Sequence, residues 1–496
     1  MIEMIANING KINSFVWGLP MLVLLVGTGI LMTVLTRVFQ ISHISYWMKH
    51  TLGSIFTDKH ITRHTDADDK SISQFQSLCT ALAATIGTGN IVGVASALLF
   101  GGPGAIFWMW IVAFFGMMTN YSENVLGIYY RRKNEKGEWC GGAMYYLKDG
   151  LGAKPGMKGI GAVLAVLFSV FCLMASFGIG NMSQINSIAG NMKAAFGIPN
   201  LVTGIILTIL AGLVILGGIK RIASVTEKLV PFMAVFYVIG ALVICIANAD
   251  QMGAVLAAIF KGAFAMKAVG GGIVGSGIKL AVTWGMKRGV FSNEAGLGSS
   301  VMVHSSSNVK EPVRQGMWGI FEVFADTIVV CSLTAFTVLS SGLVDLETGA
   351  VTSSSEGSAL VGEAFATVFG QAGPAFIALA ILLFAFSTVL GWSHYGTIAF
   401  QYLFGPGATI IYRVIFIVFI LGGATMSLDL AWDLSDTFNG LMAIPNLIGV
   451  LSLSPVVCRI TKNYVDRHIR GIKEEPMLSA FPDIQEAVAK DLNESD

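Results

Sequence analysis

The sequence predicts an all-α polytopic membrane protein with about eleven transmembrane helices. Of its 496 residues 54% are hydrophobic and only 12% are charged, whereas soluble proteins carry ~25% charge. Its apolar residues form continuous runs of about 20, the length needed to cross a ~30 Å hydrocarbon core. These runs do not alternate apolar and polar residues, as the strands of an outer-membrane barrel would.

The first apolar run, from Phe15 to Leu35, is predicted to be a true span rather than a signal peptide. It is longer than the ~7–15-residue core of a signal peptide, and it ends at Arg37 without a small-residue cleavage site. The expected spans cover residues 15–36, 74–99, 104–130, 159–190, 200–218, 230–248, 272–302, 317–341, 372–394, 409–427 and 434–458.

Lysine and arginine predict the orientation, because they concentrate in alternate loops. Segments 37–73, 131–158 and 459–496 are rich in both residues, whereas 342–363 carries four carboxylates and no Lys or Arg. By the positive-inside rule the basic segments face the cytoplasm. We therefore expect the N-terminus outside and the C-terminus in the cytoplasm.

Two spans contradict the usual composition of a helix. Residues 80–93 and 279–296 each open apolar and meet a Thr-x-Gly step, Thr85–Gly87 and Thr283–Gly285, before becoming rich in Gly and polar residues. Each Gly costs a helix ~1 kcal/mol relative to Ala, and unwound backbone survives in a membrane only where protein buries it or where it lines a cavity. The pattern predicts two discontinuous helices; the alternative is close helix packing through small residues.

The two interrupted segments lie five spans apart, which is typical of inverted-repeat transporters. We accordingly divide the chain into four parts. Residues 1–73 form an extracellular N-terminus, an extra transmembrane helix and a cytoplasmic interfacial segment, 74–248 the first five-helix repeat, 249–458 the second, and 459–496 a solvated cytoplasmic tail. In such folds, freed N–H groups bind a carboxylate, and freed carbonyls bind Na⁺ and an ammonium group.

Charged residues near the second interruption are expected to be paired, since charge within a membrane is costly. Lys287, Arg288 and Glu294 are predicted to form a gating or packing network toward the inner mouth rather than to contact substrate.

Two polar clusters add candidate site residues. Ser387 and Thr388 offer adjacent hydroxyls suited to a hard cation, and Trp392 shares the helix face of Thr388 and could wall a small pocket. The alternative is hydroxyls bonded to their own helix and an interfacial Trp. Asn181 and Gln184 could line a polar cavity or hydrogen-bond between helices.

Other functional classes find no support. The seven histidines and six cysteines lack metal-ligand spacing, and no nucleophile elbow or phosphate loop occurs. Gly270–Gly275 fits G-x-G-x-x-G, but no strand precedes it, so we interpret it as a helix entry. The formal net charge of +1 indicates no nucleic-acid partner, and nothing indicates ATP-driven pumping or enzymatic chemistry.

Over nearly its whole length the chain resembles the alanine/glycine:cation symporters, also called sodium:alanine symporters. The resemblance lies in five stretches, which are Gly101–Gly116 (GGPGAIFWMWIVAFFG), Thr85–Asn90 (TIGTGN), Glu138–Tyr146 (EWCGGAMYY), Ser292–Ser299 (SNEAGLGS) and Gly391–Trp392. It implies a LeuT-like fold of the APC superfamily, with two inverted five-helix repeats preceded by one extra helix, and Na⁺-coupled uptake across a bacterial or archaeal cytoplasmic membrane.

The resemblance also implies a site. The substrate carboxylate would meet N–H groups around Gly87, Thr88, Gly89 and Asn90, and its ammonium would meet carbonyls near Thr283, Trp284 and Gly285. Thr388 and Trp392 would bound the side-chain pocket, and Na⁺ would lie between carbonyls near Ala84–Gly87 and the Ser387 and Thr388 hydroxyls.

We therefore expect a sodium-coupled symporter that imports a small neutral amino acid, alanine or glycine favoured, by alternating access. Its partners would be the amino acid, the sodium ion and the lipid bilayer. Proton coupling remains an alternative, with Glu123, Glu294, Glu322 and Asp326 as titratable candidates. The chain could also be a glutamine-preferring member of the family or a transporter-like membrane sensor.

Overall fold

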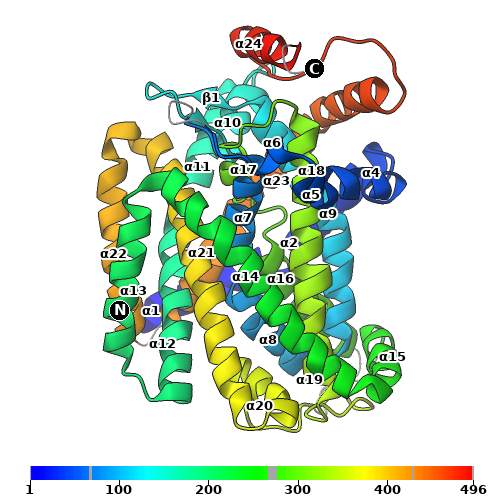
Figure 1. Cartoon of the computed structure of the whole chain (residues 1–496), viewed down its shortest axis with the longest axis vertical. Coiled ribbons are helices and arrows are strands. Elements are labelled where there is room, and N and C mark those ends of the chain that lie inside the picture. The colour runs from blue at the N-terminus through cyan, green and yellow to red at the C-terminus, as the bar shows by residue number, and fades with distance from the viewer. Residues whose placement is uncertain (1, 66–69, 266–275, 427–428, 494–496) are drawn as a thin grey trace.

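The computed structural model describes residues 2–65, 70–265, 276–426 and 429–493, and its described residues form a bundle of helices with one two-stranded hairpin (Figure 1). The stretch Gly270–Gly275, expected to open a helix, lies outside the described residues. In the first half of the chain the elements are α1 (Ile2–Val16), α2 (Leu19–Leu35), α3 (Phe39–Ser42), α4 (Ile44–Met48), η1 (Lys49–Gly53), α5 (Ser54–Thr57), α6 (Lys59–Thr62), α7 (Gln74–Thr85), η2 (Thr88–Asn90), α8 (Val92–Gly101), α9 (Gly104–Tyr129), β1 (Arg132–Lys133), β2 (Trp139–Cys140), α10 (Ala143–Tyr145), η3 (Tyr146–Leu151), α11 (Lys158–Phe177), η4 (Gly178–Met182), α12 (Ser183–Phe196), α13 (Asn200–Ile215) and α14 (Gly218–Ala247).

The second half is helical throughout its described elements. These are η5 (Ala249–Gln251), α15 (Met252–Ala263), α16 (Ser276–Asn293), α17 (Val301–His304), α18 (Pro312–Val323), η6 (Phe324–Cys331), α19 (Ser332–Ser340), α20 (Gly357–Phe369), α21 (Ala372–Phe404), η7 (Pro406–Ala408), α22 (Thr409–Thr425), α23 (Asp429–His468) and α24 (Pro482–Asn493). The strands of the first half pair antiparallel, with Arg132 opposite Cys140.

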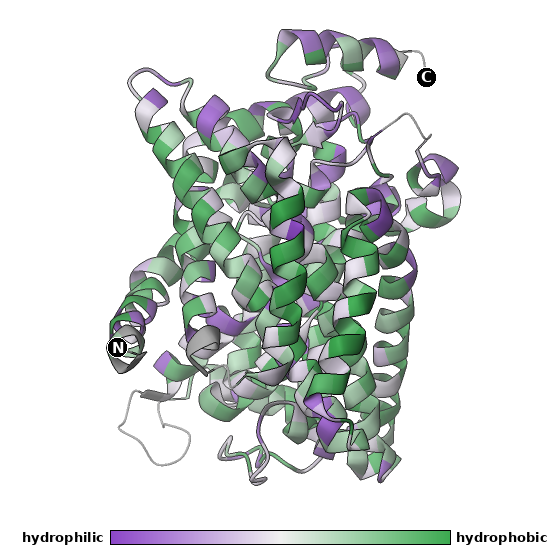
Figure 2. Cartoon of the chain, turned by 90° about the vertical axis from the view of Figure 1, so that its left-hand side faces the viewer, coloured by the Kyte–Doolittle hydropathy of each residue, from purple (hydrophilic) through white to green (hydrophobic). Residues whose placement is uncertain are grey.

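The bundle has two ends, which we call the tail face and the opposite face. The tail face carries α24 and the β1–β2 hairpin, at the top of Figure 1, and the opposite face carries α15 and α20 at the bottom. Apolar residues follow the middle of the helices, and hydrophilic residues gather near the C-terminus (Figure 2). Many large apolar side chains on the outside of the bundle are exposed, as lipid-facing residues are.

The described residues contain eight helices long and apolar enough to cross a membrane, or nine when one bent pair counts as a single span. Each of the eleven expected ranges contains helical residues. Two of these ranges contain no described helix or bent pair that is both long and apolar enough to cross a membrane. In 200–218, α13 has only 16 residues. The range 272–302 is divided between α16 and α17, and α16 carries three cations.

The first predicted interruption is confirmed. Helix α7 ends at Thr85, and the chain bends by 58° before α8 continues toward the opposite face. Gly87 and its neighbours lie between the two halves in extended and 3₁₀ conformations. All residues from Thr80 to Asn90 are buried, so protein shields the unwound backbone.

The predicted position of the second interruption is wrong. Thr283–Gly285 lie inside the continuous helix α16, and the break comes about two turns later, at residues 294–300 between α16 and α17. Gly289 is helical as well, packed against Val112. The glycines before the break serve close packing, whereas Glu294, Gly296 and Gly298 adopt positive φ (56°, 90° and 73°) and turn the chain out of the helix.

On the tail face the ends of the two broken helices are tied together. Ile72 and Ser307 form a parallel bridge, in which the Ile72 N–H donates to the Ser306 carbonyl (3.0 Å) and the Asn308 N–H donates to the Ile72 carbonyl (2.8 Å). Arg131, at the end of α9, donates to the carbonyls of Ser305 and Ser307 (3.1 and 2.6 Å). The segments before α7 and after α17 are therefore held as one unit.

The C-terminal tail is packed against the bundle rather than solvated throughout. Leu478 is only 2% exposed, and the Ala480 N–H donates to the Tyr129 carbonyl at 2.9 Å. At the end of α23, His468 Nε2 lies 2.7 Å from Glu311 Oε1, and Arg467 pairs with the same carboxylate. The prediction of a solvated tail over 459–496 did not anticipate these apolar and paired residues.

One glycine contact predicts a clear packing effect. At Gly104, the start of α9, an added Cβ would overlap the carbonyl carbon of Gly262 in α15. Because backbone cannot move aside cheaply, Gly104→Ala should destabilise the protein by ~1–3 kcal/mol and lower its thermal unfolding midpoint. Gly253→Ala is the matched control, since its Cβ would meet no atom within 4 Å; equal midpoints for the two variants would contradict the close approach.

Candidate functional site at the two broken helices

The break after α7 is held open by side chains from its own segment and from α12. The Gly87 N–H donates to Asn90 Oδ1 (2.9 Å), and the Thr88 N–H donates to Gln184 Oε1 (3.3 Å). Gly87 cannot carry a side chain here, since a Cβ would lie 2.5 Å from Thr388 Oγ1. Gln184 therefore joins the site, whereas Asn181 donates to the Phe416 carbonyl (2.7 Å) and connects helices.

The hydroxyls of Ser387 and Thr388 meet the carbonyl end of α7. Ser387 Oγ lies 3.2 Å from the Ala83 carbonyl and Thr388 Oγ1 lies 3.4 Å from the Ile86 carbonyl. Both hydroxyls also donate to the Phe384 carbonyl of their own helix, at 2.8 and 3.0 Å. The C-terminal end of a helix carries partial negative charge, so these oxygens form an environment suited to a hard cation.

Asn90 is anchored from a π-helical turn. Its Nδ2 donates to Asp326 Oδ1 (2.6 Å), and Ser292 Oγ donates to the same oxygen (3.1 Å). Asp326 lies in η6, and such π-helical turns occur frequently at functional sites. Through this carboxylate, η6 connects the first broken helix to the last turn of α16. Sequence reasoning did not pair Asn90 with Asp326. The available signal was a single Asp within an apolar span.

The second break is fixed by buried polar contacts. Glu294 accepts hydrogen bonds from Trp392 Nε1 (2.8 Å) and Ser299 Oγ (2.5 Å). The Ala295 N–H donates to Asn293 Oδ1 at 3.0 Å. The Trp392 ring lies directly against Gly180 of η4, where an added Cβ would overlap it. Trp392 is buried and connects α21 and η4 to the break.

Between the second break and the tail face lies a buried polar network that the sequence did not predict as a unit. Asn446 Nδ2 donates to the Gly296 carbonyl (2.9 Å) and to Glu123, and Tyr146 donates to Asn446. His304 Nε2 lies 3.0 Å from Glu322 Oε2. Among the described residues, Glu123 Oε2 and Glu322 Oε1 find no hydrogen-bond partner.

A cavity of about 340 Å³ reaches the first break from the side of α8. Its lining includes Thr88, Arg288, Phe291 and Asp433. Thr88 Oγ1 and Arg288 Nε are buried and have no hydrogen-bond partner in the part of the chain that the structure describes. The cavity therefore places polar groups beside the unwound segment, on the side of the molecule nearer the opposite face.

The predicted network of Lys287, Arg288 and Glu294 toward the inner mouth is not formed as expected. Arg288 lies beside Gly93 of α8, and Lys287 Nζ pairs with Asp436 Oδ2 of α23 at 2.5 Å, both in the half nearer the opposite face. Only Glu294 lies at the break. Because α16 runs from the opposite face toward the break, its cations come before the break and not after it.

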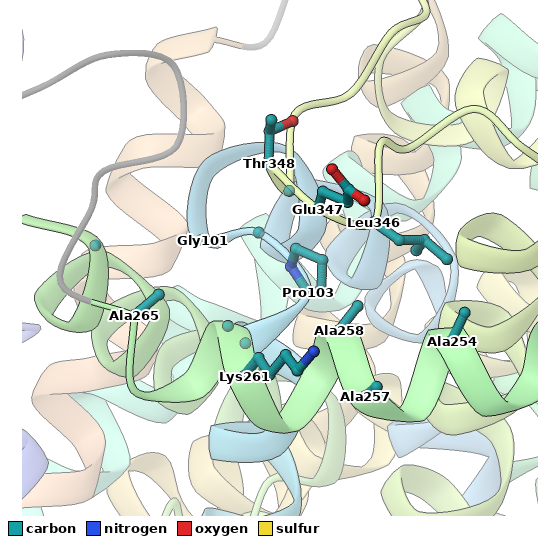
Figure 3. A pocket seen from close by; sticks show the side chains of 15 residues that line it. Gly101, Pro103, Ala254, Ala257, Ala258, Lys261, Ala265, Leu346, Glu347 and Thr348 are labelled. Atoms are coloured by element: carbon teal, nitrogen blue, oxygen red, sulfur yellow. The ribbon is translucent and has the colours of Figure 1, made fainter.

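A separate cavity of about 490 Å³ lies at the opposite face (Figure 3). It is lined by Gly101–Gly104, which connect the end of α8 to the start of α9, and by Lys261 of α15. Thr88 lies thirteen residues before Gly101 in the sequence, which corresponds to about 20 Å along a helix at ~1.5 Å per residue. This hollow is therefore no part of the site at the break.

Comparison with known proteins identifies the family. The profile described as "Sodium:alanine symporter family" matches residues 2–478. The chain is 45% identical over 459 residues to the protein named "Sodium/alanine symporter AgcS" of Methanococcus maripaludis, covering 91% of this chain and 96% of that one. The chain belongs to the sodium:alanine symporter family. It is a sodium-coupled amino-acid symporter of the membrane and not an enzyme.

Another relative is named for a different substrate. The "Probable sodium/glutamine symporter GlnT" of Bacillus subtilis is 36% identical over 473 residues, 95% of this chain and 93% of that one. Among solved structures, that of MhsT in complex with L-phenylalanine superposes with a TM-score of 0.50 at 15% identity, covering 81% of this chain and 99% of that chain. This likeness shows the fold alone, which is LeuT-like.

The structure of this symporter brings together most of the predicted site residues. Gly87, Thr88, Gly89 and Asn90 lie in the first break, Gln184 and Thr388 contact it, and a Cβ on Gly391 would meet Ala84 at 2.6 Å. Thr85 ends α7, with its hydroxyl bonded to the Ala81 carbonyl (3.2 Å). Thr283, Trp284 and Gly285 are not at the break: the Trp284 ring stacks on Phe100 at 4.6 Å and Gly285 packs on Ala105.

The Trp392–Glu294 hydrogen bond gives a prediction for the symporter. Trp392→Phe keeps an aromatic ring against Gly180 but removes the donor to buried Glu294 Oε1. Leaving a buried acceptor unpaired costs ~1–3 kcal/mol, so the midpoint of thermal unfolding should fall and uptake should weaken. Trp108→Phe is the control, because that indole donates to the Ala263 carbonyl at the end of α15 (3.1 Å), on the opposite face. Unchanged uptake in Trp392→Phe, or equal loss in both variants, would contradict a role at the break.

Proposed function

We propose that the chain imports a small neutral amino acid, with alanine or glycine favoured, together with Na⁺ by alternating access. The observation that carries this proposal is the meeting of the Ser387 and Thr388 hydroxyls with the carbonyls of Ala83 and Ile86 at the end of α7. All four residues are buried, and converging carbonyl and hydroxyl oxygens can replace the hydration shell of Na⁺. Ala84 and Gly87 supply the neighbouring backbone.

The amino acid would lie beside this cation, between the two breaks. Its carboxylate would meet the N–H groups of Gly87–Asn90 and the N-terminal end of α8, where the helix dipole favours negative charge. There it would replace Asn90 Oδ1 and Gln184 Oε1, which accept from the Gly87 and Thr88 N–H groups in this structure. Its ammonium would meet carbonyls of the second break, residues 294–300, in place of Thr283–Gly285, whose backbone belongs to α16. Thr388 and Trp392 would bound the side chain, and Gln184 would hold Thr88 in position before the substrate binds.

The finer architecture is part of the same proposal. Eleven spans would form, with α13 as a short one and α16 with α17 as the second broken one, in two inverted five-helix repeats over 74–248 and 249–458 after the extra helix of 1–73. The tail face would be cytoplasmic, since it carries the basic segments 131–158 and 459–496. The short helices α3–α6 would lie on the inner surface, as the exposed Ile41 and Phe56 favour.

Uptake into vesicles tests the proposal. Purified protein reconstituted without a pH gradient should accumulate labelled alanine when Na⁺ is higher outside, and replacing Na⁺ by K⁺ should stop accumulation. Unlabelled glycine should compete more strongly than unlabelled glutamine. Accumulation of equal size with and without the Na⁺ gradient would refute sodium coupling, and stronger competition by glutamine would refute the preference for small substrates.

Proton coupling is a second candidate because of one observation. Glu123 Oε2 and Glu322 Oε1 are buried without a hydrogen-bond partner among the described residues, and a carboxyl group that binds a proton there would relieve the cost of a buried charge. An imposed pH gradient in Na⁺-free vesicles would then drive alanine uptake, and Glu322→Gln would remove it. We favour sodium, since the hydroxyl–carbonyl cluster lies at the break itself.

A further inference from the structure

A pocket on the tail face combines cationic side chains with a buried histidine. It encloses about 240 Å³ and lies beyond the ends of the broken helices, away from the cavity at Thr88. Three of its lining side chains are cationic, Lys70, Lys220 and Arg413, and one is acidic, Glu138. The formal charge of this lining favours an anion.

The interior of the pocket is shaped around these groups. His394 of α21 is 4% exposed, and its Nε2 has no hydrogen-bond partner among the described residues. Gly218 begins α14 with φ of 70°, and a Cβ there would lie 3.5 Å from Arg413 Nη1. The positive φ favours glycine here, and it places the start of α14 beside the guanidinium. A planar guanidinium binds phosphate oxygens in pairs, which makes phosphate a fitting anion.

The rim of the pocket indicates where the anion comes from. Helices α13 and α22 pack side by side at the left of Figure 1. Near their tail-face ends Leu213 and Leu216 are 62% and 49% exposed, and Ile410 and Ile411 are 50% and 56% exposed. These apolar side chains flank Gly217–Lys220 and Arg413 in the sequence, so a molecule with an anionic head and apolar chains could contact both regions.

We propose that this pocket binds the phosphate group of an anionic phospholipid, whose acyl chains lie along α13 and α22. Basic pockets between helices on the cytoplasmic side of a membrane bind such headgroups. Arg413 and Lys220 hold the phosphate oxygens, and His394 completes the pocket from within the bundle. Inorganic phosphate offers the same oxygens but would leave the apolar rim uncovered.

A bound lipid would act on the transporter as well as fill a pocket. Lys70 precedes α7 and Ser306 follows α17, and both line the pocket. The lipid therefore contacts the tied segments of the two broken helices on one side and the α13–α14 turn on the other. A movement that separates these two sides of the pocket would remove contacts with the headgroup. The lipid would therefore stabilise this arrangement of the helices by as much as it binds it more tightly than the alternative arrangement.

The test titrates phosphatidylglycerol into the full-length protein in neutral detergent and follows thermal unfolding. We expect phosphatidylglycerol to raise the unfolding midpoint, phosphatidylcholine to leave it nearly unchanged, and inorganic phosphate at constant ionic strength to have a smaller effect than phosphatidylglycerol. In Lys220→Gln/Arg413→Gln the apparent dissociation constant for phosphatidylglycerol should rise at least about tenfold, since two charged hydrogen-bond donors are lost.

Matched variants keep the test decisive. Lys136→Gln removes an exposed cation from the hairpin on the same face, outside the pocket, and should bind phosphatidylglycerol as the wild type does. If the double variant fails to fold, Arg413→Lys and Arg413→Gln can be compared singly, and the charge-retaining variant should bind more tightly. Wild-type affinity in the charge-neutral variants, or equal protection by inorganic phosphate, would overturn the assignment.

Discussion

Gly87→Leu is expected to abolish alanine uptake while the protein remains in the membrane. A Cβ at this position would lie 2.5 Å from Thr388 Oγ1 and 3.4 Å from Gln184 Oε1, so a leucine would fill the space between the first break and α21. Both binding regions that we assign depend on that space. The concentration of alanine required for half-maximal binding should rise at least about a hundredfold, which corresponds to ~2.8 kcal/mol, within the range of severe overpacking.

Two controls separate a blocked site from a misfolded protein. Gly190→Leu places the same side chain on α12, where a Cβ meets no atom within 4 Å, and should preserve uptake. Gly87→Ala should give an intermediate loss, because a methyl group also collides with Thr388. Insertion is checked by yield and by a monodisperse profile in detergent. Normal alanine binding by well-folded Gly87→Leu would show that the substrate does not lie at this break.

Thr388→Ala is expected to weaken sodium binding more than alanine binding. The variant loses the hydroxyl that contacts the Ile86 carbonyl at 3.4 Å, and an oxygen ligand lost from a buried site costs on the order of 1–3 kcal/mol. The Na⁺ concentration for half-maximal uptake should therefore rise about tenfold, equivalent to ~1.4 kcal/mol. Ser387→Ala should act in the same direction through the Ala83 carbonyl.

The measurement is uptake of labelled alanine at varied Na⁺ and saturating alanine. Thr388→Ser keeps a hydroxyl and should recover most of the sodium dependence. Ser393→Ala is the matched control on the same helix, since its hydroxyl donates to the Leu390 carbonyl of that helix (2.7 Å). If Thr388→Ala leaves the sodium dependence unchanged, or Ser393→Ala shifts it equally, the cation lies elsewhere.

The first broken helix could be predicted from sequence because the residues that disfavour a helix lie at the position where the helix ends. Thr85–Asn90 combine two glycines with polar residues in the middle of a long apolar run, and none of these six residues is a strong helix former. The second break was misplaced because glycine has two uses. Gly285 and Gly289 permit close contact between α16 and α9, whereas the residues that leave the helix are Glu294, Gly296 and Gly298, and a glutamate at positive φ carries no compositional signal.

Pairing between distant segments was beyond sequence reasoning. Ser387 and Thr388 could be proposed as hydroxyl ligands, but which carbonyls they face follows from how α21 packs on α7. Asn181 and Gln184 could not be distinguished by their spacing. In the structure Asn181 lies in the π-helical turn η4 and contacts Phe416, whereas Gln184 lies in α12 and contacts Thr88. Likewise the charge on Lys287 indicated a partner without showing that Asp436 supplies it.

The bridge between Ile72 and Ser307 bears on how tightly the two cargoes are coupled. It joins the segment that leads into α7, whose carbonyls face the proposed cation region, to the segment that leaves α17, beyond the break that we propose faces the ammonium. A displacement of either half-helix therefore carries the other with it. Sodium and amino acid would lose their ligands in one concerted event, so that release of the ion alone, which would dissipate its gradient, is opposed by a pair of backbone hydrogen bonds.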